Sequence, residues 1–181
     1  AFNSNIIKRC SEIAASSNEK VSFFCIGKKG SDILSKNFNV IETNNDIFDE
    51  LSFENISLIG ELLMNKFLSK DFDKIEIVYN KFKNAATQIV TSEQFLPIEN
   101  NNSEDDQKDS SDYIFEPSQI EIISELIPKS LKTQLYKSVR DSYASEHGAR
   151  MTAMHKATDN ATELRDQLKL TYNKARQAAI T

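Results

Sequence analysis

The 181-residue sequence lacks the features that mark disulfide-bonded or membrane-spanning proteins. Its two cysteines, Cys10 and Cys25, have no CxxC spacing and no histidine cluster, which predicts free buried thiols in a reducing compartment. No apolar run approaches the roughly 20 residues of a membrane span. The first residues, AFNSNIIKRC, also lack the apolar core of a signal peptide. We therefore expect a soluble chain that can still join a peripheral membrane assembly.

Catalytic and cofactor motifs are missing as well. The single candidate phosphate loop, Gly27–Ser31, has neither the third glycine of a dinucleotide fingerprint nor the GK[ST] ending of a Walker motif. A plain turn is favoured there, and a small-molecule binder that uses this loop stays open as an alternative. His147 and His155 are eight residues apart, so they cannot share a metal ion across one helical turn. We expect no catalytic residue, no cofactor and no metal site.

Proline and glycine are almost absent from the carboxy-terminal part of the chain. The stretch from Lys129 to Thr181 contains no proline and one glycine, Gly148, which predicts one long helix. At 1.5 Å per residue this helix is about 75 Å long, more than the width of a domain of about 130 residues. Part of it should therefore project from the body.

The projecting helix carries a stripe of apolar and small residues, which we call the seam. Its members follow one another at alternating intervals of 3 and 4: Met154, Ala157, Ala161, Leu164, Leu168, Thr171, Ala175 and Ala178. An average spacing of 3.5 residues is the period of a coiled coil. Because the side chains are small, a second helix can approach closely, whereas one helix alone buries little apolar area. We expect a second helix to cover the seam; the alternative is that the seam packs on the chain's own body.

Charge is unevenly distributed along the chain, whose net charge is −5. From Lys129 onward there are 10 basic and 5 acidic residues, and before it 12 basic and 22 acidic residues. The basic residues are spread along the helix without a dense Lys/Arg block. This pattern favours an acidic protein partner or a solvated face, and it argues against nucleic-acid binding.

Residues 1–116 alternate between helix-like and strand-like patterns. Helices are predicted at 3–16, 30–36 and 53–69, and strands at 21–26, 39–43, 74–82, 87–95 and 113–115. The strands at 74–82 and 87–95 can be neighbours joined at 83–86. Such alternation is typical of an α/β domain with a mainly parallel sheet. Because a helix comes first, we expect the preceding strand to lie upstream, in sequence not present here.

The predicted domain boundaries follow from composition. Residues 99–112, ENNNSEDDQKDSSD, contain no apolar side chain and predict an exposed acidic loop at the end of an α/β domain of residues 1–116. A cation-binding role for this loop is the alternative, although the spacing of a calcium loop is absent. Residues 117–181 form the helical region, with a break or kink near Pro128.

The sequence resembles a known family over nearly its whole length, and most closely in the long helix. The matching segments are Ala144-Ser-Glu-His147, Ala149-Arg-Met151, Met154, Ala157-Thr-Asp-Asn-Ala161 and Tyr172-Asn-Lys-Ala-Arg-Gln-Ala-Ala-Ile-Thr181. They resemble the carboxy-terminal helix of the gamma subunit of rotary F-type ATP synthases. The resemblance extends to Tyr113-Ile-Phe-Glu-Pro117, Leu126-Ile-Pro128, Gln134-Leu-Tyr136 and Phe2-Asn-Ser-Asn-Ile-Ile7, and is weakest in the acidic loop.

The resemblance implies a fold and a mechanical function. Gamma subunits have a Rossmann-like α/β domain that binds no nucleotide, between two long helices that form an antiparallel coiled coil. This coil is the central stalk, or rotor shaft. It turns within a ring of three alpha and three beta subunits and couples ion-driven rotation to ATP synthesis or hydrolysis. Its foot contacts the epsilon subunit and the c ring at a membrane, which implies a peripheral location on the cytoplasmic face of a bacterial inner membrane.

The resemblance also implies contact residues. Arg176, Gln177 and Thr181 match polar positions near the upper shaft that suit contact with loops of the beta subunits, while Tyr113 and Glu116 match foot positions that face the c ring or epsilon. Solvated or simply packed side chains are the alternative for each. Catalytic residues belong to other subunits, so the chain itself is expected to be non-catalytic.

The sequence departs from the family at both ends. The family's amino-terminal helix, the strand after it and about a dozen final residues have no counterpart here, so we expect a truncated chain whose exposed seam self-associates. A coiled-coil scaffold or interaction module with an α/β body is the alternative function.

Overall fold

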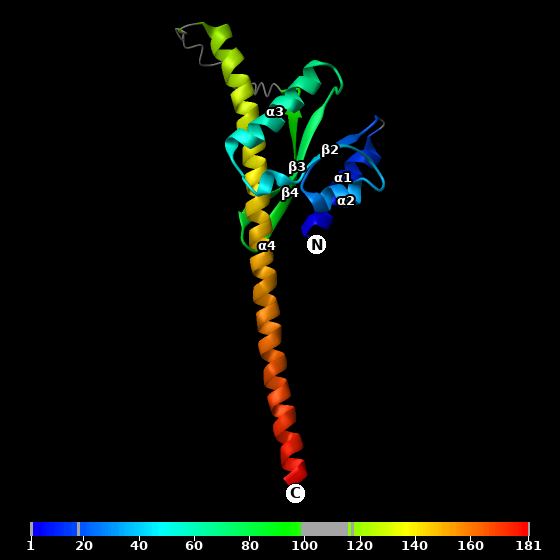
Figure 1. Ribbon diagram of the computed structural model, residues 1–181, viewed down its shortest axis with the longest axis vertical. Coiled ribbons are helices and arrows are strands. Elements are labelled where there is room, and N and C mark those ends of the chain that lie inside the picture. Colours follow the sequence, from blue (N-terminus) through cyan, green and yellow to red (C-terminus); the bar gives the residue numbers. More distant parts are fainter. Residues whose placement is uncertain (1, 18, 99–115, 117, 181) are drawn as a thin grey trace, which may run out of the picture.

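The computed structural model describes residues 2–17, 19–98, 116 and 118–180. The predicted acidic loop at 99–112, the predicted strand at 113–115, Tyr113 and Thr181 lie outside these residues. The described elements are α1 Phe2–Ser16, β1 Ser22–Ile26, α2 Lys28–Leu34, β2 Asn39–Asn44, the 3-10 helix η1 Asp46–Phe48, α3 Phe53–Leu68, β3 Ile75–Asn84, β4 Thr87–Leu96 and α4 Gln119–Ile180. They confirm the predicted α/β body with a long carboxy-terminal helix (Figure 1).

The strands form two pairs rather than the mainly parallel sheet that the alternation predicts. β1 pairs with β2 in parallel, and β3 pairs with β4 in antiparallel orientation. The antiparallel pair is the hairpin that the alternating pattern allowed. Its turn is closed by the Asn84 side-chain oxygen, which accepts hydrogen bonds from the backbone N–H groups of Ala86 and Thr87 at 3.1 and 2.7 Å. A short turn of this kind can join only antiparallel neighbours.

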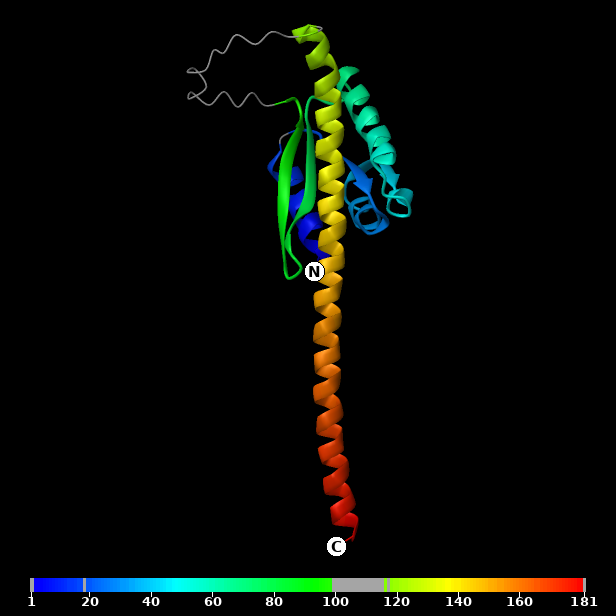
Figure 2. The same cartoon turned by 90° about the vertical axis from the view of Figure 1, so that its left-hand side faces the viewer.

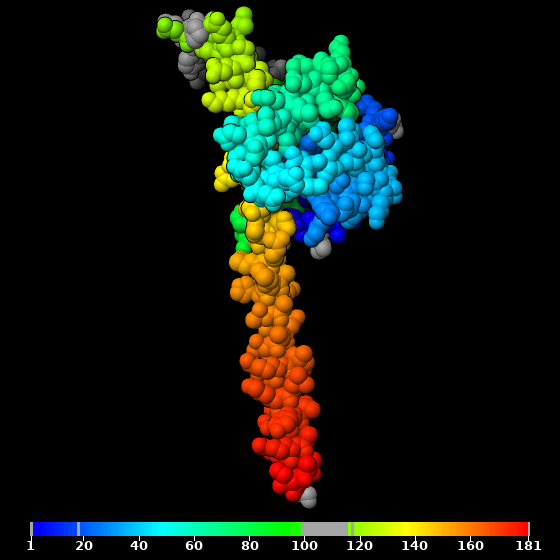
Figure 3. Space-filling view, in the orientation of Figure 1, coloured from blue at the N-terminus to red at the C-terminus, as the bar shows by residue number. Residues whose placement is uncertain are grey.

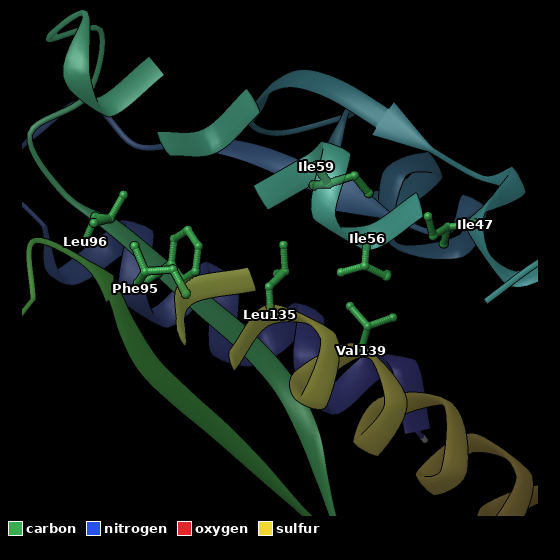
Figure 4. Close-up of a cluster of buried hydrophobic side chains, with 8 residues drawn as sticks. Ile47, Ile56, Ile59, Phe95, Leu96, Leu135 and Val139 are labelled. Atoms are coloured by element: carbon green, nitrogen blue, oxygen red, sulfur yellow. The ribbon is translucent and has the colours of Figure 1, made fainter. Parts of the chain in front are cut away.

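The main core lies between the strands and two helices, α3 and α4. Ser52 caps α3 by accepting a hydrogen bond from the Asn55 N–H, and this helix then buries Ile56 and Ile59. These side chains pack against Leu135 and Val139 of α4 and against Phe95 and Leu96 of β4 (Figure 4). Ile47 of η1 and Leu131 of α4 complete the cluster. Each fully buried side chain of this size stabilises the fold by about 1.5–3 kcal/mol. The core therefore fixes α4 to the body through its amino-terminal half.

A second, smaller core covers the opposite face of the strands. Cys10 of α1, Cys25 of β1 and Leu34 of α2 are buried together, and Val78 of β3 packs against them. Alternate residues of a strand point to opposite faces. In β1, Ile26 joins the first core and Cys25 the second, so α1 and α2 cover one face of the strands and α3 and α4 the other.

β1 and β3 contribute to the same two cores but do not pair with each other. Ile26 and Ile77 pack in the first core, and Cys25 and Val78 in the second, so both strands lie in one layer. Within the described residues, β1 pairs with β2 alone and β3 with β4 alone. We call the space between the two facing, unpaired edges the strand gap.

The long helix α4 continues through Pro128 without interruption, so this proline does not divide the helical region; the predicted kink there stays a prediction. Its first half lies against α3 and β3, and its second half stands clear of the body (Figures 2 and 3). Among the described helices, none is long and apolar enough to span a bilayer.

The turn of the β3–β4 hairpin is fastened to α4 at its last contact with the body. Gly148 is buried, and a Cβ atom at this position would lie 3.1 Å from both the Cα and the carbonyl oxygen of Ala85. One turn further on, the Thr152 hydroxyl donates to the Ala85 carbonyl at 3.1 Å. Because the glycine has no side chain, the hairpin turn can lie directly on the helix.

Replacing Gly148 with alanine is expected to lower the free energy of unfolding by about 1–3 kcal/mol, because the backbone of Ala85 must move away from the new Cβ atom. Gly30→Ala in α2 is the matched control, since no atom lies within 4 Å of a Cβ there. This control should be neutral or stabilising by up to about 1 kcal/mol. Urea unfolding of both variants measures the difference, and an equal response would contradict the close approach at Ala85.

Candidate functional site

The candidate site is the surface of α4 beyond the body. Every residue from Ala153 to Ile180 is exposed, over a length of about 40 Å. Figure 3 shows this segment, in orange and red, without any covering element. The alternative that the seam packs on the chain's own body is therefore wrong.

The seam lies along one face of this projecting segment. Its three large side chains, Met154, Leu164 and Leu168, are 57%, 56% and 60% exposed. A shallow depression runs between Ala161, Leu164, Leu168 and Tyr172, flanked by Arg165 and Lys169. Alanines between larger apolar residues leave room for the side chains of a second helix at close range. The surface thus has the form of one half of a coiled coil.

The seam points away from the hairpin that holds α4. The hydroxyls of Ser145 and Thr152 face the hairpin: Ser145 donates to the carbonyl of Asn80 in β3 at 3.0 Å, and Thr152 donates to that of Ala85 in the turn at 3.1 Å. Met154 follows Thr152 by two residues, a rotation of about 200°. The seam is therefore open on the side opposite the hairpin.

Towards the body, the face that carries the seam continues into an aromatic group. His147 precedes Met154 by two helical turns, and its ring contacts Tyr143 edge-on with centroids 4.5 Å apart. Tyr143 in turn stacks on Phe48 of η1 at 5.7 Å. His147 is itself exposed. A helix on the seam can thus extend along α4 as far as His147 before it meets the part of the body built by η1.

The polar residues predicted to contact beta-subunit loops lie off the seam. Arg176 and Gln177 fall between Ala175 and Ala178, at two of the three heptad positions that point outward, and both are exposed. A helix on the seam would leave them accessible to other chains. Thr181 lies outside the described residues, so its role stays a prediction.

At the other end of α4, Glu116 is exposed and Tyr113 lies outside the described residues. Ser118 caps the start of the helix: its hydroxyl accepts from the Glu121 N–H at 3.3 Å and donates to the Glu121 carboxylate at 3.0 Å. The next two turns expose four large apolar side chains that were not predicted to form a surface group, Ile120, Ile123, Leu126 and Ile127. Their density over eight residues was the available signal.

The described residues offer no sign of a reactive centre. They contain no group of three or more His, Cys, Asp or Glu side chains able to hold a metal ion. Gly27 takes a φ of 106° at the start of α2 and forms a turn against Phe48. Burial, and then the neighbouring Cys25, raise the pKa of Cys10 to about 11, and burial raises the pKa of Cys25. Both free thiols are therefore protonated near neutral pH and poorly nucleophilic.

Comparison with known proteins agrees with this architecture. A family model described as ATP synthase matches residues 1–181. The ATP synthase gamma chain of Flavobacterium psychrophilum is 62% identical over 182 residues, which cover 100% of this chain and 63% of that protein. The gamma chain of Flavobacterium johnsoniae is 64% identical with the same coverage, and that of Geobacter sp. is 41% identical over 99% of this chain. The chain thus spans somewhat less than two thirds of the length of these relatives.

Solved structures share the fold at low sequence identity. The central stalk and c-ring structure of the Tetrahymena thermophila mitochondrial ATP synthase matches 86% of this chain and 69% of its own, with a TM-score of 0.68 and 21% identity. The rotor of the Euglena gracilis enzyme matches 99% of this chain and 69% of its own, with a TM-score of 0.66 and 23% identity. Taken with the family match over all 181 residues, these findings show that the chain belongs to the ATP synthase family and resembles its gamma chain throughout.

Proposed function

We propose that this chain forms the α/β body and one shaft helix of the rotor of an F-type ATP synthase. The observation that carries this proposal is the seam, an exposed coiled-coil face on a helix that projects about 40 Å from its body. The chain is a non-catalytic part of the machine, and ATP is made or hydrolysed on the beta subunits. It works peripherally at the cytoplasmic face of a bacterial inner membrane.

The occupant of the seam is the amino-terminal helix of the gamma subunit, in antiparallel orientation. Nearly 30 exposed residues with little apolar area gain too little from packing to hold a helix in place alone. A second helix against Leu164 and Leu168 supplies that packing and stiffens the segment for transmitting torque. Without it, the 181-residue chain self-associates through the seam, which sedimentation at increasing concentration measures; a strict monomer would contradict this.

The strand gap supports the insertion of one more strand of the gamma subunit into the body. Two unpaired edges in one buried layer leave backbone N–H and C=O groups without strand partners, and such groups are costly inside a protein. The gap is covered by the α3–α4 core on one face and the α1–α2 core on the other. We therefore place the strand that follows the amino-terminal helix in this gap, where it joins the two pairs into one sheet with a predominantly apolar central strand.

The mechanism is mechanical coupling between shaft angle and catalytic site. An asymmetric shaft presents a different face to each of three beta subunits, so its angle biases their conformations, and their ligand state biases the angle in return. Arg176 and Gln177 contact beta-subunit loops near the end of the shaft, on the side away from the seam. Thr181 also contacts these loops. Glu116 and Tyr113 contact the epsilon subunit or the c ring at the foot.

Neutralising Lys174 and Arg176 together, as Lys174→Gln and Arg176→Gln, should reduce ATP-driven ion pumping about two- to fivefold, as expected for two exposed ion pairs lost at an interface. Because both side chains are exposed, thermal unfolding should not change. Pumping and melting of the assembled enzyme measure the two effects. Lys156→Gln with Lys169→Gln is a control on the same helix, farther from its end. Equal loss of stability and pumping would contradict the proposed contact.

The most direct functional test is assembly. Reconstituted with alpha and beta subunits, a full-length subunit containing these residues should co-purify as a complex that hydrolyses ATP and rotates. A stable homodimer with no affinity for alpha and beta subunits would favour the coiled-coil scaffold instead.

A further inference from the structure

Asn80 of β3 is a buried polar residue whose side chain is not satisfied. It is 2% exposed, and its Nδ2 atom has no hydrogen-bond partner within the described part of the chain. A buried donor left without an acceptor costs about 1–3 kcal/mol. Natural folds seldom retain such a group unless a missing component satisfies it. The acceptor of Asn80 should therefore come from outside the described residues.

The side chain of Asn80 faces α1. Residues of a strand alternate between faces, and Ile77 and Tyr79 lie on the α4 side, where Ile77 packs in the main core. Val78, on the other side, packs with Cys10 of α1. Asn80 shares that face with Val78. Its backbone carbonyl already accepts from the hydroxyl of Ser145 at 3.0 Å, so the unsatisfied group is the Nδ2 amino group of the side chain.

The start of α1 lies near the same end of β3. Asn80 is beyond the midpoint of β3, towards the hairpin turn. Figures 1 and 2 both place the amino-terminal end of α1 towards that turn. A strand that fills the gap and continues into α1 must leave the sheet on the α1 face at this end. Its connection to Phe2 would pass over the face that carries Asn80.

We propose that Asn80 is a positioning residue for this connection: its Nδ2–H donates to a main-chain carbonyl in the segment that joins the gap strand to α1. This inference rests on the proposed strand insertion and adds the residue that fixes the strand's end. A one-residue slip of the strand would move the carbonyl away from Asn80 and reverse every side chain of the strand between the two cores. A single buried polar contact can thus select one register.

The test uses a full-length subunit made by joining these residues to the remaining regions of the Flavobacterium psychrophilum gamma chain. Nitrogen-15 NMR should show side-chain amide protons of Asn80 that exchange at least about 100-fold more slowly than those of the exposed Asn84, as expected for a buried hydrogen bond. Nuclear Overhauser contacts should link them to the segment before Phe2. Rapid exchange of the Asn80 side-chain amide protons in this unsubstituted subunit would overturn the proposal.

Asn80→Asp provides the second arm, because it keeps the shape of the side chain but replaces the donor with an acceptor. Deuterium exchange in the gap strand and its connection should rise about tenfold or more, while the β3–β4 ladder stays protected. Asn84→Asp is the control four residues along β3, since its oxygen only accepts bonds from Ala86 and Thr87, which a carboxylate keeps. Asn84→Asp should leave deuterium exchange in the gap strand and its connection unchanged.

Two results would overturn the role of Asn80: unchanged exchange of the connection in Asn80→Asp, or an equal rise in every element, which would indicate general destabilisation. A different result would reject the proposed strand insertion rather than the role of Asn80. If no segment of the unsubstituted subunit becomes protected as a strand between β1 and β3, strand insertion itself is wrong. A protected strand together with a rapidly exchanging Asn80 amide would reject only the positioning role.

Discussion

Replacing Leu168 with glutamate is expected to reduce pairing of the two shaft helices about 30- to 1000-fold, and with it the ATP-driven rotation of the assembled enzyme. Leu168 lies at the centre of the seam and is 60% exposed in this chain, so a partner helix must cover it. A carboxylate enclosed there without a counter-charge costs about 2–4 kcal/mol even after local adjustment. Single-molecule rotation and thermal unfolding of the full-length subunit measure the loss.

Leu170→Glu is the matched control for this substitution. Leu170 is on the same helix, two residues away, and is 63% exposed, but it faces about 200° from Leu168. In the isolated full-length subunit this control should leave unfolding unchanged within about 0.5 kcal/mol. If both variants lose the same stability, the seam is no more an interface than the rest of the helix, and the coiled-coil assignment fails.

Leu135→Ala should produce the largest loss of stability within the body, about 2–5 kcal/mol. Leu135 of α4 is 2% exposed and packs in the core with Ile59 of α3 and Phe95 of β4 (Figure 4). Its removal leaves a cavity at the place where α4 meets both α3 and β4. Urea unfolding followed by circular dichroism measures the change. The loosened attachment of α4 should also raise hydrogen exchange in α3.

Leu58→Ala tests whether this effect depends on burial. Leu58 is a leucine of α3 that lies about 200° from Ile56, away from the core, and it is 64% exposed. Its replacement should cost less than about 0.5 kcal/mol, because the side chain leaves no cavity. Similar losses of unfolding free energy in Leu135→Ala and Leu58→Ala would mean that Leu135 does not hold α4 against α3 and β4.

Much of the fold was predictable because periodicity reports burial directly. The apolar residues of α3, spaced three and four apart, identify the face that packs on α4, and alternation identified the hairpin strands. The short helix α2 begins at Lys28 rather than at residue 30, since Gly27 with its positive φ already ends the strand. Boundaries of this kind depend on single backbone angles, which composition does not reveal.

The pairing of the strands could not be obtained in the same way. An α/β alternation favours a parallel sheet, yet the choice between one sheet and two pairs depends on which edges meet in space. The tertiary role of Gly148 was hidden for a similar reason: in sequence it is only a weak helix former, whereas in the fold it admits the Ala85 backbone.

The candidate site was largely predictable, because a coiled-coil face is a local pattern. The 3.5-residue spacing located the seam, and the structure leaves all of it exposed. The apolar residues Ile120, Ile123, Leu126 and Ile127 at the start of α4 were missed. They lie within about 120° of one face of the helix, which is the pattern of an ordinary core-facing stripe, and only their exposure shows that they are unlike a core segment.

The central claim is that the seam is covered by a second helix of the same subunit, and cysteine labelling tests it most directly. Leu164→Cys and Leu170→Cys would be introduced separately into the full-length subunit, free of its ring, and reacted with a maleimide. The native Cys10 and Cys25 are buried with raised pKa values, so they should react slowly. Both sites are similarly exposed in this chain, at 56% and 63%. The account predicts labelling at least about tenfold slower at position 164 than at position 170; equal rates at the two positions would contradict it.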